Sequence, residues 1–223
     1  MVALLVILTL IVAVSIELII ARRRKTSEEP SVAAIPVFNK SSLYAPEGFY
    51  FSDFHTWVHP EDKDLKVGID NFALKALGKI LIKSIAPEGK KIKQGDTIIE
   101  AEVHGQTVKF RSPVNGTIKS VNRNIFNNTV SDVYGSDWGL TIEREDTAIE
   151  AIRKMLSGST AYHWMKSELR RFKDFLGENS FAPEAVGVTM YDGGNIAEGV
   201  LSSLSKNAIL DFEEQFLNKH DNA

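Results

Sequence analysis

The chain has 223 residues, enough for one or two small domains that each bury a hydrophobic core. Its net charge of −3 and its isoelectric point near 6.0 give no general attraction to nucleic acid. The absence of cysteine excludes disulfides, thiolate metal sites and cysteine nucleophiles.

Residues 1–21 are almost entirely apolar, and a helix of about 20 such residues spans roughly 30 Å, the thickness of one hydrocarbon core. Arg22, Arg23, Arg24 and Lys25 follow directly. Because basic flanks stay cytoplasmic, we predict a single-pass helix in the cell membrane, with the soluble domains facing the cytoplasm. The alternative is a cleaved signal peptide, which carries its positive charge before the apolar run and ends in small residues; this segment does neither.

Residues 22–48 are predicted to be a basic flank followed by a flexible linker, because they are polar, small and interrupted by prolines. A flexible coil of this kind spans roughly 25 Å between its ends. Such a linker would let a domain move close to the bilayer.

Residues 49–144 are predicted to form a β-rich domain, because short branched runs alternate with turn residues. The expected strands lie at residues 57–59, 65–69, 80–82, 97–101, 107–110 and 117–121. One helix interrupts them, with Asp70 or Asn71 as its N-cap and Gly78 as its end. Short strands separated by glycine and proline favour a small barrel or sandwich.

Residues 145–223 are predicted to be mainly helical. We expect helices at 146–156, at 160–176 with Ser159 as cap, and at 208–217, together with a strand at 186–191. The predicted buried positions are Tyr162, Met165, Leu169, Phe172 and Leu176 in the second helix and Ile209, Phe212, Phe216 and Leu217 in the last.

The segment from Pro87 to Gly116 reads as a β-hairpin with its tip at residues 103–106. Gly95-Asp96 precede the tip and Pro113-Val114-Asn115-Gly116 follow it. This frame is similar to that of lipoyl- and biotinyl-carrier domains, which present a modified lysine at a hairpin tip.

Taken together, the β-rich region resembles the glycine cleavage system H-protein family. The resemblance rests on four groups of residues: 51–58 with His55-x-Trp57, 67–73 with the Val-Gly-Ile run, the turn residues of the hairpin, and 134–138 with Tyr134-Gly135-x-x-Trp138. It implies a lipoyl-like barrel-sandwich hybrid, here preceded by one transmembrane helix and followed by a helical C-terminal region.

The family's lipoyl lysine lies in a Glu-x-x-Lys arrangement at the tip. In this chain Glu102 matches the glutamate, and Gly105 falls at the lysine position, where there is no amine to acylate. The nearest alternative, Lys109, lies four residues further on, inside the returning strand. We therefore expect no lipoate and no other cofactor.

The residues around Gly105 are candidate partner contacts, namely Glu102, His104, Gly105 and Gln106. His104 has two interpretations: a solvated turn residue, or a contact residue beside a glycine that lets a partner's backbone approach. The five histidines are dispersed without the spacing of a metal site, so no metal is expected. The lysines between Lys79 and Lys93 fit either a solvated edge or attraction to anionic lipid.

The sequence shows no phosphate-loop lysine, no serine elbow and no catalytic triad, so we expect no enzyme. The leading hypothesis is a non-catalytic, membrane-anchored adaptor or accessory subunit that docks on a partner protein, with lipid contacts through residues 1–21. The alternative is a lipoyl-type carrier of glycine cleavage or a related pathway. A weaker alternative is a membrane-fusion-type adaptor of an export system.

Overall fold

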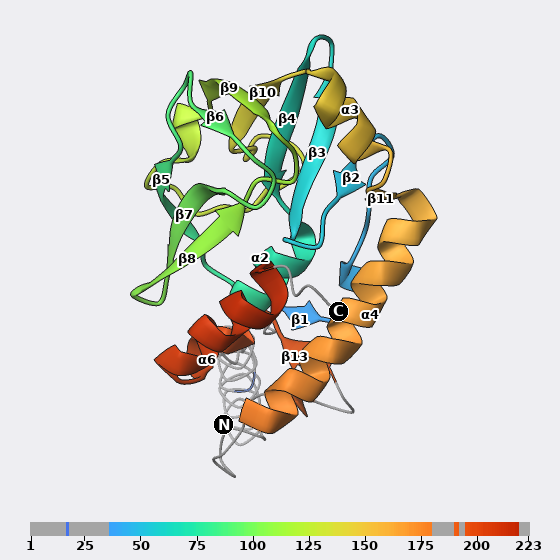
Figure 1. Cartoon of the computed structure of the whole chain (residues 1–223). Coiled ribbons are helices and arrows are strands. Elements are labelled where there is room, and N and C mark those ends of the chain that lie inside the picture. Colours follow the sequence, from blue (N-terminus) through green and yellow to red (C-terminus); the bar gives the residue numbers. More distant parts are fainter. Residues whose placement is uncertain (1–16, 18–35, 180–189, 192–194, 219–223) are drawn as a thin grey trace, which may run out of the picture. The chain divides into compact units, whose positions relative to one another are not determined.

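The structure is a computed structural model that describes Glu17 and residues 36–179, 190–191 and 195–218 (Figure 1). The chain divides into two compact units, Met1–Ile35 and Pro36–Ala223. The predicted membrane helix and its basic flank belong to the first unit and, apart from Glu17, lie outside the described residues. Across the part of the chain that the structure describes, no helix combines the length and the apolar character needed to cross a membrane.

The second unit is built on two main β-sheets. The larger sheet has the order β11-β2-β3-β4-β10-β9-β6, and the smaller one has the order β5-β7-β8. The strands of the larger sheet are β2 (Tyr50–Phe51), β3 (Thr56–Glu61), β4 (Asp64–Ile69), β6 (Lys91–Ile92), β9 (Gly116–Val121), β10 (Leu140–Glu143) and β11 (Leu156–Ser157). Those of the smaller sheet are β5 (Leu81–Ile85), β7 (Thr97–Val103) and β8 (Gln106–Arg111).

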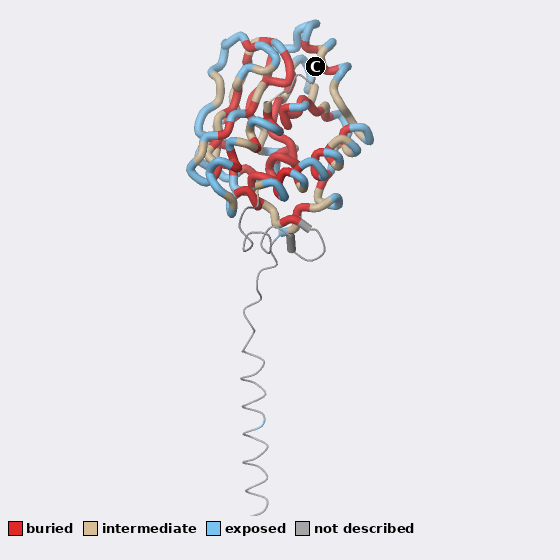
Figure 2. Tube along the Cα trace, turned by 60° about the horizontal axis from the view of Figure 1, so that its bottom comes forward, coloured by how far each residue is buried: buried red, intermediate tan, exposed pale blue. Residues whose placement is uncertain are grey.

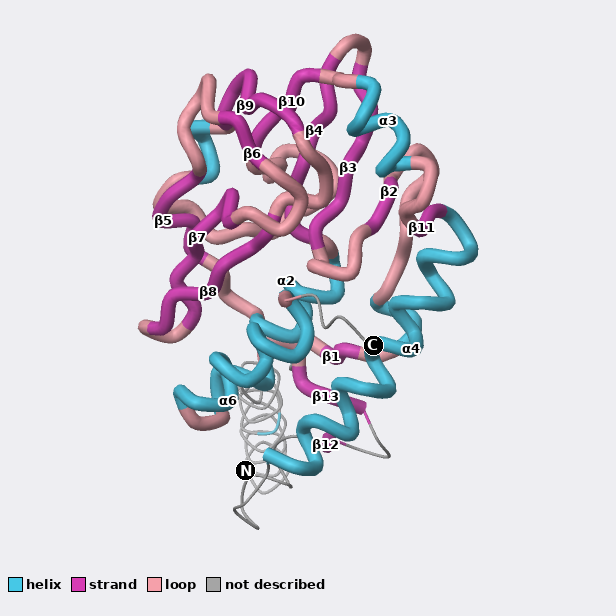
Figure 3. Tube along the Cα trace, in the orientation of Figure 1, coloured by secondary structure: helices cyan, strands magenta, loops and turns pink. Residues whose placement is uncertain are grey.

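The short strands β1 and β13 and the helix α6 lie near α2 at one end of this unit, whereas α3 lies at the other end beside β3 and β4 (Figure 3). A third, short sheet has the order β1-β13-β12, formed by β1 (Val37–Phe38), β13 (Asn195–Ala197) and β12 (Met190–Tyr191). The α-helices are α2 (Asn71–Leu77), α3 (Asp146–Ile152), α4 (Gly158–Asn179) and α6 (Lys206–Phe212), and α6 continues as the π-helix η4 (Glu213–Leu217). The short 3-10 helices are η1 (Lys40–Ser42), η2 (Arg123–Ile125) and η3 (Val200–Ser203).

All six strands predicted between residues 57 and 121 are present, and so is the helix between them. Asp70 is the N-cap of α2, because its Oδ1 accepts a hydrogen bond of 2.9 Å from the Ala73 amide. The Gly78 amide closes the helix by donating to the Leu74 carbonyl over 2.8 Å. The β-rich domain and its helix are therefore confirmed.

The linker prediction was too long at its C-terminal end. Residues 36–48 belong to the folded unit, because β1 pairs with β13 and the side chains of Phe38 and Leu43 are buried. Isolated apolar residues between polar ones give no periodic pattern, so the sequence did not reveal this contact with a distant segment.

Two boundaries in the C-terminal region also differ from the prediction. The helix expected at 146–156 ends at Ile152, and Leu156–Ser157 pair with β2 instead. Ser159 lies inside α4 rather than capping it, since α4 begins at Gly158. Of the strand expected at 186–191, the structure describes only Met190–Tyr191, and the rest lies outside the described residues.

The helix α4 and the helical segment formed by α6 and η4 bury the apolar faces that the sequence predicts. Met165, Leu169, Phe172 and Leu176 of α4 are buried, while Tyr162 is only half-buried. In α6 and η4 all four predicted residues are buried, and α6 begins two residues earlier than expected with Ser205 as its N-cap.

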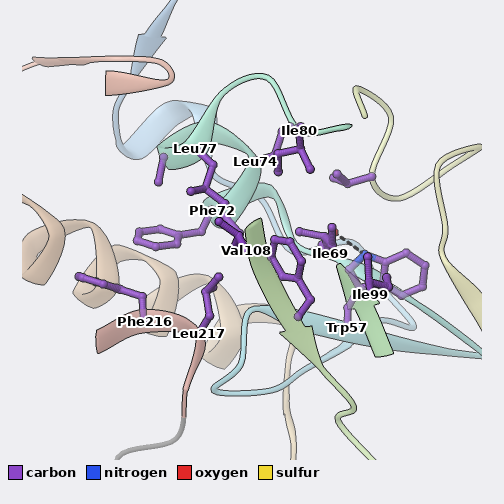
Figure 4. Close-up of a cluster of buried hydrophobic side chains, with 14 of the residues drawn as sticks. Trp57, Ile69, Phe72, Leu74, Leu77, Ile80, Ile99, Val108, Phe216 and Leu217 are labelled. Atoms are coloured by element: carbon purple, nitrogen blue, oxygen red, sulfur yellow. Dashed lines mark hydrogen bonds between the residues drawn. The ribbon is translucent and has the colours of Figure 1, made fainter. Parts of the chain in front are cut away.

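One hydrophobic core extends from the sheets into the C-terminal region (Figure 2). In this core, Phe72 of α2 lies between Val108 of β8 and Phe216 of η4 (Figure 4). The ring centroids of Phe72 and Phe216 are 5.9 Å apart. The C-terminal region is thus packed on the same core as the hairpin.

Candidate functional site

The hairpin formed by β7 and β8 ends in a two-residue turn. Val103 and Gln106 are the last paired residues, so His104 and Gly105 alone form the turn. Both have a left-handed backbone, with φ of 49° and 76°. This combination is typical of a type I′ turn, which favours glycine at its second position. The turn geometry therefore gives Gly105 a structural reason for its presence.

The space around the tip is open. A Cβ atom added at Gly105 would have no neighbouring heavy atom within 4 Å, and His104 is exposed. Glu102 forms an ion pair of 2.9 Å with Lys83 of the adjacent strand. Gln106 donates from Nε2 to the Gly105 carbonyl over 3.1 Å. The four candidate contact residues thus lie together on one projecting element.

The turns that frame the hairpin meet at its base. The Gly95 amide donates to the Ser112 carbonyl over 2.9 Å, and the Gln94 amide donates to Asn115 Oδ1 over 2.7 Å. Asp96 accepts a hydrogen bond of 2.8 Å from the Lys93 amide through Oδ2. The frame of a carrier hairpin is therefore complete although its tip has no lysine.

Lys109, the alternative attachment residue, lies away from the tip. It is opposite Glu100 in the middle of the β7–β8 ladder, and its side chain is exposed. It borders a shallow groove of about 490 Å³ between β8 and the C-terminal helices, which is lined by Thr107, Lys109, Leu210, Glu213, Glu214 and Asn218. A group attached to Lys109 would start from this groove and not from a projecting turn.

A buried charged cluster lies elsewhere in the fold, around His55. The side chain of His55 is fully buried, and its Nδ1 lies 2.7 Å from Asp70 Oδ2. Its Nε2 lies 3.6 Å from Glu168 Oε2 in α4 and makes no hydrogen bond within the described residues. The imidazole is stacked between the rings of Phe72 and Trp164, at centroid distances of 4.4 and 4.9 Å.

These neighbours keep the imidazole charged. Burial lowers the pKa of His55, but the carboxylates of Asp70 and Glu168 outweigh it and raise the pKa to about 9. The two aromatic faces also favour an imidazolium over a neutral ring. Within the described ranges, no group of three or more His, Asp or Glu side chains, this one included, is arranged so that it could hold a metal ion.

Sequence reasoning found the hairpin but missed this cluster. In the sequence His55 stands out only as part of the His-x-Trp segment and as one of the dispersed histidines, and Glu168 is not among the predicted site residues. The available signal was weak: a histidine before a buried tryptophan, and a glutamate on the apolar side of α4. Arg22, Arg23, Arg24 and Lys25, the orientation signal, lie outside the described residues.

Together, the two main sheets and the hairpin with its complete frame define a small β-domain of the lipoyl-carrier class. The family model described as Glycine cleavage H-protein matches residues 49–168, more than half of the chain. The chain therefore belongs to the glycine cleavage H-protein family, and the segment from residue 169 onward lies outside the match.

Two relatives of known family agree with this assignment, and one solved structure is also similar in part. The glycine cleavage system H protein of Bifidobacterium longum is 30% identical over 114 residues, which cover 50% of this chain and 83% of the relative. That of Coprothermobacter proteolyticus is 34% identical over 107 residues, covering 46% and 84%. A crystal structure of a glycine cleavage system H protein from Mycobacterium marinum matches with a TM-score of 0.45 and 22% identity, over 55% of this chain and 98% of that one.

Proposed function

We propose that this protein is a membrane-anchored adaptor or accessory subunit of the H-protein family, which docks on a partner protein through its hairpin and carries no lipoate. One observation carries the proposal: the hairpin and its frame are complete, but the tip is a turn closed by Gly105. Acylation requires a primary amine, and the tip offers none. An exposed, rigid turn retains the shape that a partner could recognise.

A second candidate is a lipoyl-type carrier of glycine cleavage or a related pathway. The names of the relatives favour this candidate more directly than they favour an adaptor, since the relatives above are glycine cleavage system H proteins. In this chain the attachment would fall to Lys109. Its position inside β8, beside the C-terminal helices, is the reason that we place the adaptor first.

Intact-mass measurement after co-expression with a lipoate ligase separates the two candidates. We expect the wild-type chain to carry no lipoyl group. The matched variant Gly105→Lys should become at least partly lipoylated, because it restores the amine at the end of an intact frame. That result would show that the ligase can engage the hairpin, so the missing adduct on the wild type would follow from Gly105. A lipoyl adduct on the wild type that disappears in Lys109→Arg would establish the carrier instead.

Photo-crosslinking tests the docking surface itself. A crosslinker at position 104 projects from the tip, whereas one at Arg153, exposed after α3, serves as the control. We expect a specific adduct from position 104 only, in cells that express the full chain at its natural level. The adaptor is excluded if both positions give the same adducts and the detergent-extracted protein is always alone and monomeric.

A further inference from the structure

His55 lies among buried charged side chains. Asp70 and Glu168 are both buried carboxylates that face the imidazole, and they are the charged groups that act on it. Arg171, one turn along α4, lies 2.9 Å from Glu168 but is half exposed. A buried carboxylate is costly without a close cation, so loss of the His55 charge would leave two carboxylates beside the half-exposed Arg171, and the Asp70 carboxylate would lose its ion-pair partner.

Arg171 connects Glu168 to the C-terminal segment, here residues 206–218. Arg171 donates from Nη2 to the carbonyl of Gln215 over 2.8 Å. Its guanidinium carbon lies 4.2 Å from the centre of the Phe216 ring. Gln215 and Phe216 belong to the π-helix η4, an irregular element that is often found at functional positions. The residue that balances Glu168 therefore also holds the C-terminal segment.

The C-terminal segment in turn contacts β8 of the hairpin. In a hairpin with a two-residue turn, alternate residues of β8 direct their backbone groups away from β7. Lys109 is one of these, and its backbone amide interacts with the Glu213 carboxylate. The Arg111 side chain donates from Nε to Asn218 Oδ1. The C-terminal segment thus covers the outer edge of β8, where a partner strand could otherwise pair.

We propose that the charged His55 is a pH-sensitive latch, which holds α4 and with it the C-terminal segment over the edge of β8, and which releases both when the imidazole loses its proton. The latch would regulate access to the hairpin, and that role rests on the docking function proposed above. The conformational change itself needs no partner, so it can be tested separately.

The direction of the pH effect follows from proton linkage. An opened state exposes His55 with an ordinary pKa near 6.5, whereas the closed state holds it at about 9. The latch is therefore fully effective below about pH 6.5, weakens as the pH rises, and is lost above about pH 9. Between these limits the opening equilibrium constant should rise by up to about tenfold per pH unit.

Hydrogen exchange of the full-length protein in detergent tests this proposal. We expect protection of α4 and of residues 206–217 to fall together between pH 6.5 and 8.5, by up to about tenfold per unit after correction for the intrinsic rate. Protection of β3 and β4 should stay constant. His55 has a left-handed backbone, with φ of 54°, which asparagine also accepts. In His55→Asn the pH dependence should disappear, because asparagine cannot hold the charge.

His163→Asn is the matched control, since it makes the same substitution at an exposed histidine of α4 and should keep the wild-type dependence. Glu168→Gln is a second variant, which keeps the His55 imidazole but removes one of the carboxylates that raise its pKa. In this variant the pH range over which protection falls should be narrower, and the test remains available if His55→Asn fails to fold. The latch is overturned if the wild type shows no pH dependence at residues 206–217, or if Glu168→Gln leaves that dependence unchanged. Equal loss of protection in β3 and β4 would also overturn it, because the whole domain would then be opening.

Discussion

At the scale of single residues, the indole ring of Trp57 fills the space beside Gly68 that a side chain at position 68 would need. The two residues are directly opposite each other in the β3–β4 pair. A Cβ atom at position 68 would lie 2.4 Å from Trp57 Cζ2, and the indole is held in place by a hydrogen bond of 2.8 Å from Nε1 to the Ile69 carbonyl. A glycine is therefore required here by packing.

We expect Gly68→Ala to lower the free energy of unfolding by about 3 kcal/mol, because the indole must move and lose its hydrogen bond. Chemical denaturation of the purified protein measures this. Gly177→Ala is the control: this glycine is exposed in α4 with no neighbour near its Cβ position, and alanine there should stabilise the helix by about 0.5 kcal/mol. A Gly68→Ala variant as stable as the wild type would contradict the packing argument.

The sequence predicts the position of a site residue where neighbouring residues in the chain determine that position. Gly105 could be placed at the tip because turn residues on both sides fix the register of the hairpin. His55 could not be assigned a role, because its charge depends on Asp70 in another element and on Glu168 far along the chain. No local pattern reports such a contact.

At the scale of secondary structure, the junction of α6 and η4 carries an aromatic cluster. Phe212 and Phe216 stack at a centroid distance of 4.8 Å, and Phe216 also contacts Phe72 and Phe172. Both side chains of the junction are fully buried. This cluster fixes the C-terminal segment against α2 and α4.

Truncation of this cluster should be costly. We expect Phe216→Ala to destabilise the protein by about 3–5 kcal/mol, through lost apolar burial and the cavity that remains. Leu210→Ala removes an aliphatic side chain from the same segment, but Leu210 is 46% exposed, so its effect should stay below about 1 kcal/mol. Thermal unfolding of both variants measures these losses of stability. Equal losses in Phe216→Ala and Leu210→Ala would show that η4 is not part of the core.

Elements with a local signal were predicted well, and those made by distant pairing were not. Strands of the β-domain have branched residues and flanking turns, and α2 has both a cap and a terminating glycine. β1 and β11 consist of two residues each, and their partners are β13 and β2. Such short strands exist only because a distant segment supplies their hydrogen bonds, so propensity alone cannot locate them.

At the scale of the whole molecule, the family domain is extended in both directions. Residues 49–168 match the family, while residues 169–218 supply part of the shared core and the cover on β8. The N-terminal residues add the proposed membrane anchor, which rests on their apolar composition and on the basic residues that follow.

The anchor predicts a clear fractionation result. We expect the full chain to remain in the membrane fraction after an alkaline carbonate wash, and a variant lacking residues 1–21 to become extractable. The absence of native cysteine allows the orientation to be tested as well. A single cysteine introduced at His104 should react with an impermeant maleimide only after the membrane is opened. Labelling in intact cells would place the hairpin outside the cytoplasm and favour the export-type alternative.

The pairing of β1 with β13 has a mechanical consequence. Any tension along the N-terminal segment enters the folded unit at Pro36 and reaches Val37 and Phe38 first. Two residue pairs alone are a weak attachment, but Phe38 is completely buried between Phe72 and Phe172. Extracting this ring from the core would resist a pull far more than the strand pairing does. If the proposed membrane anchor transmits a pull to Pro36, the buried ring of Phe38 is therefore the contact expected to oppose it most strongly.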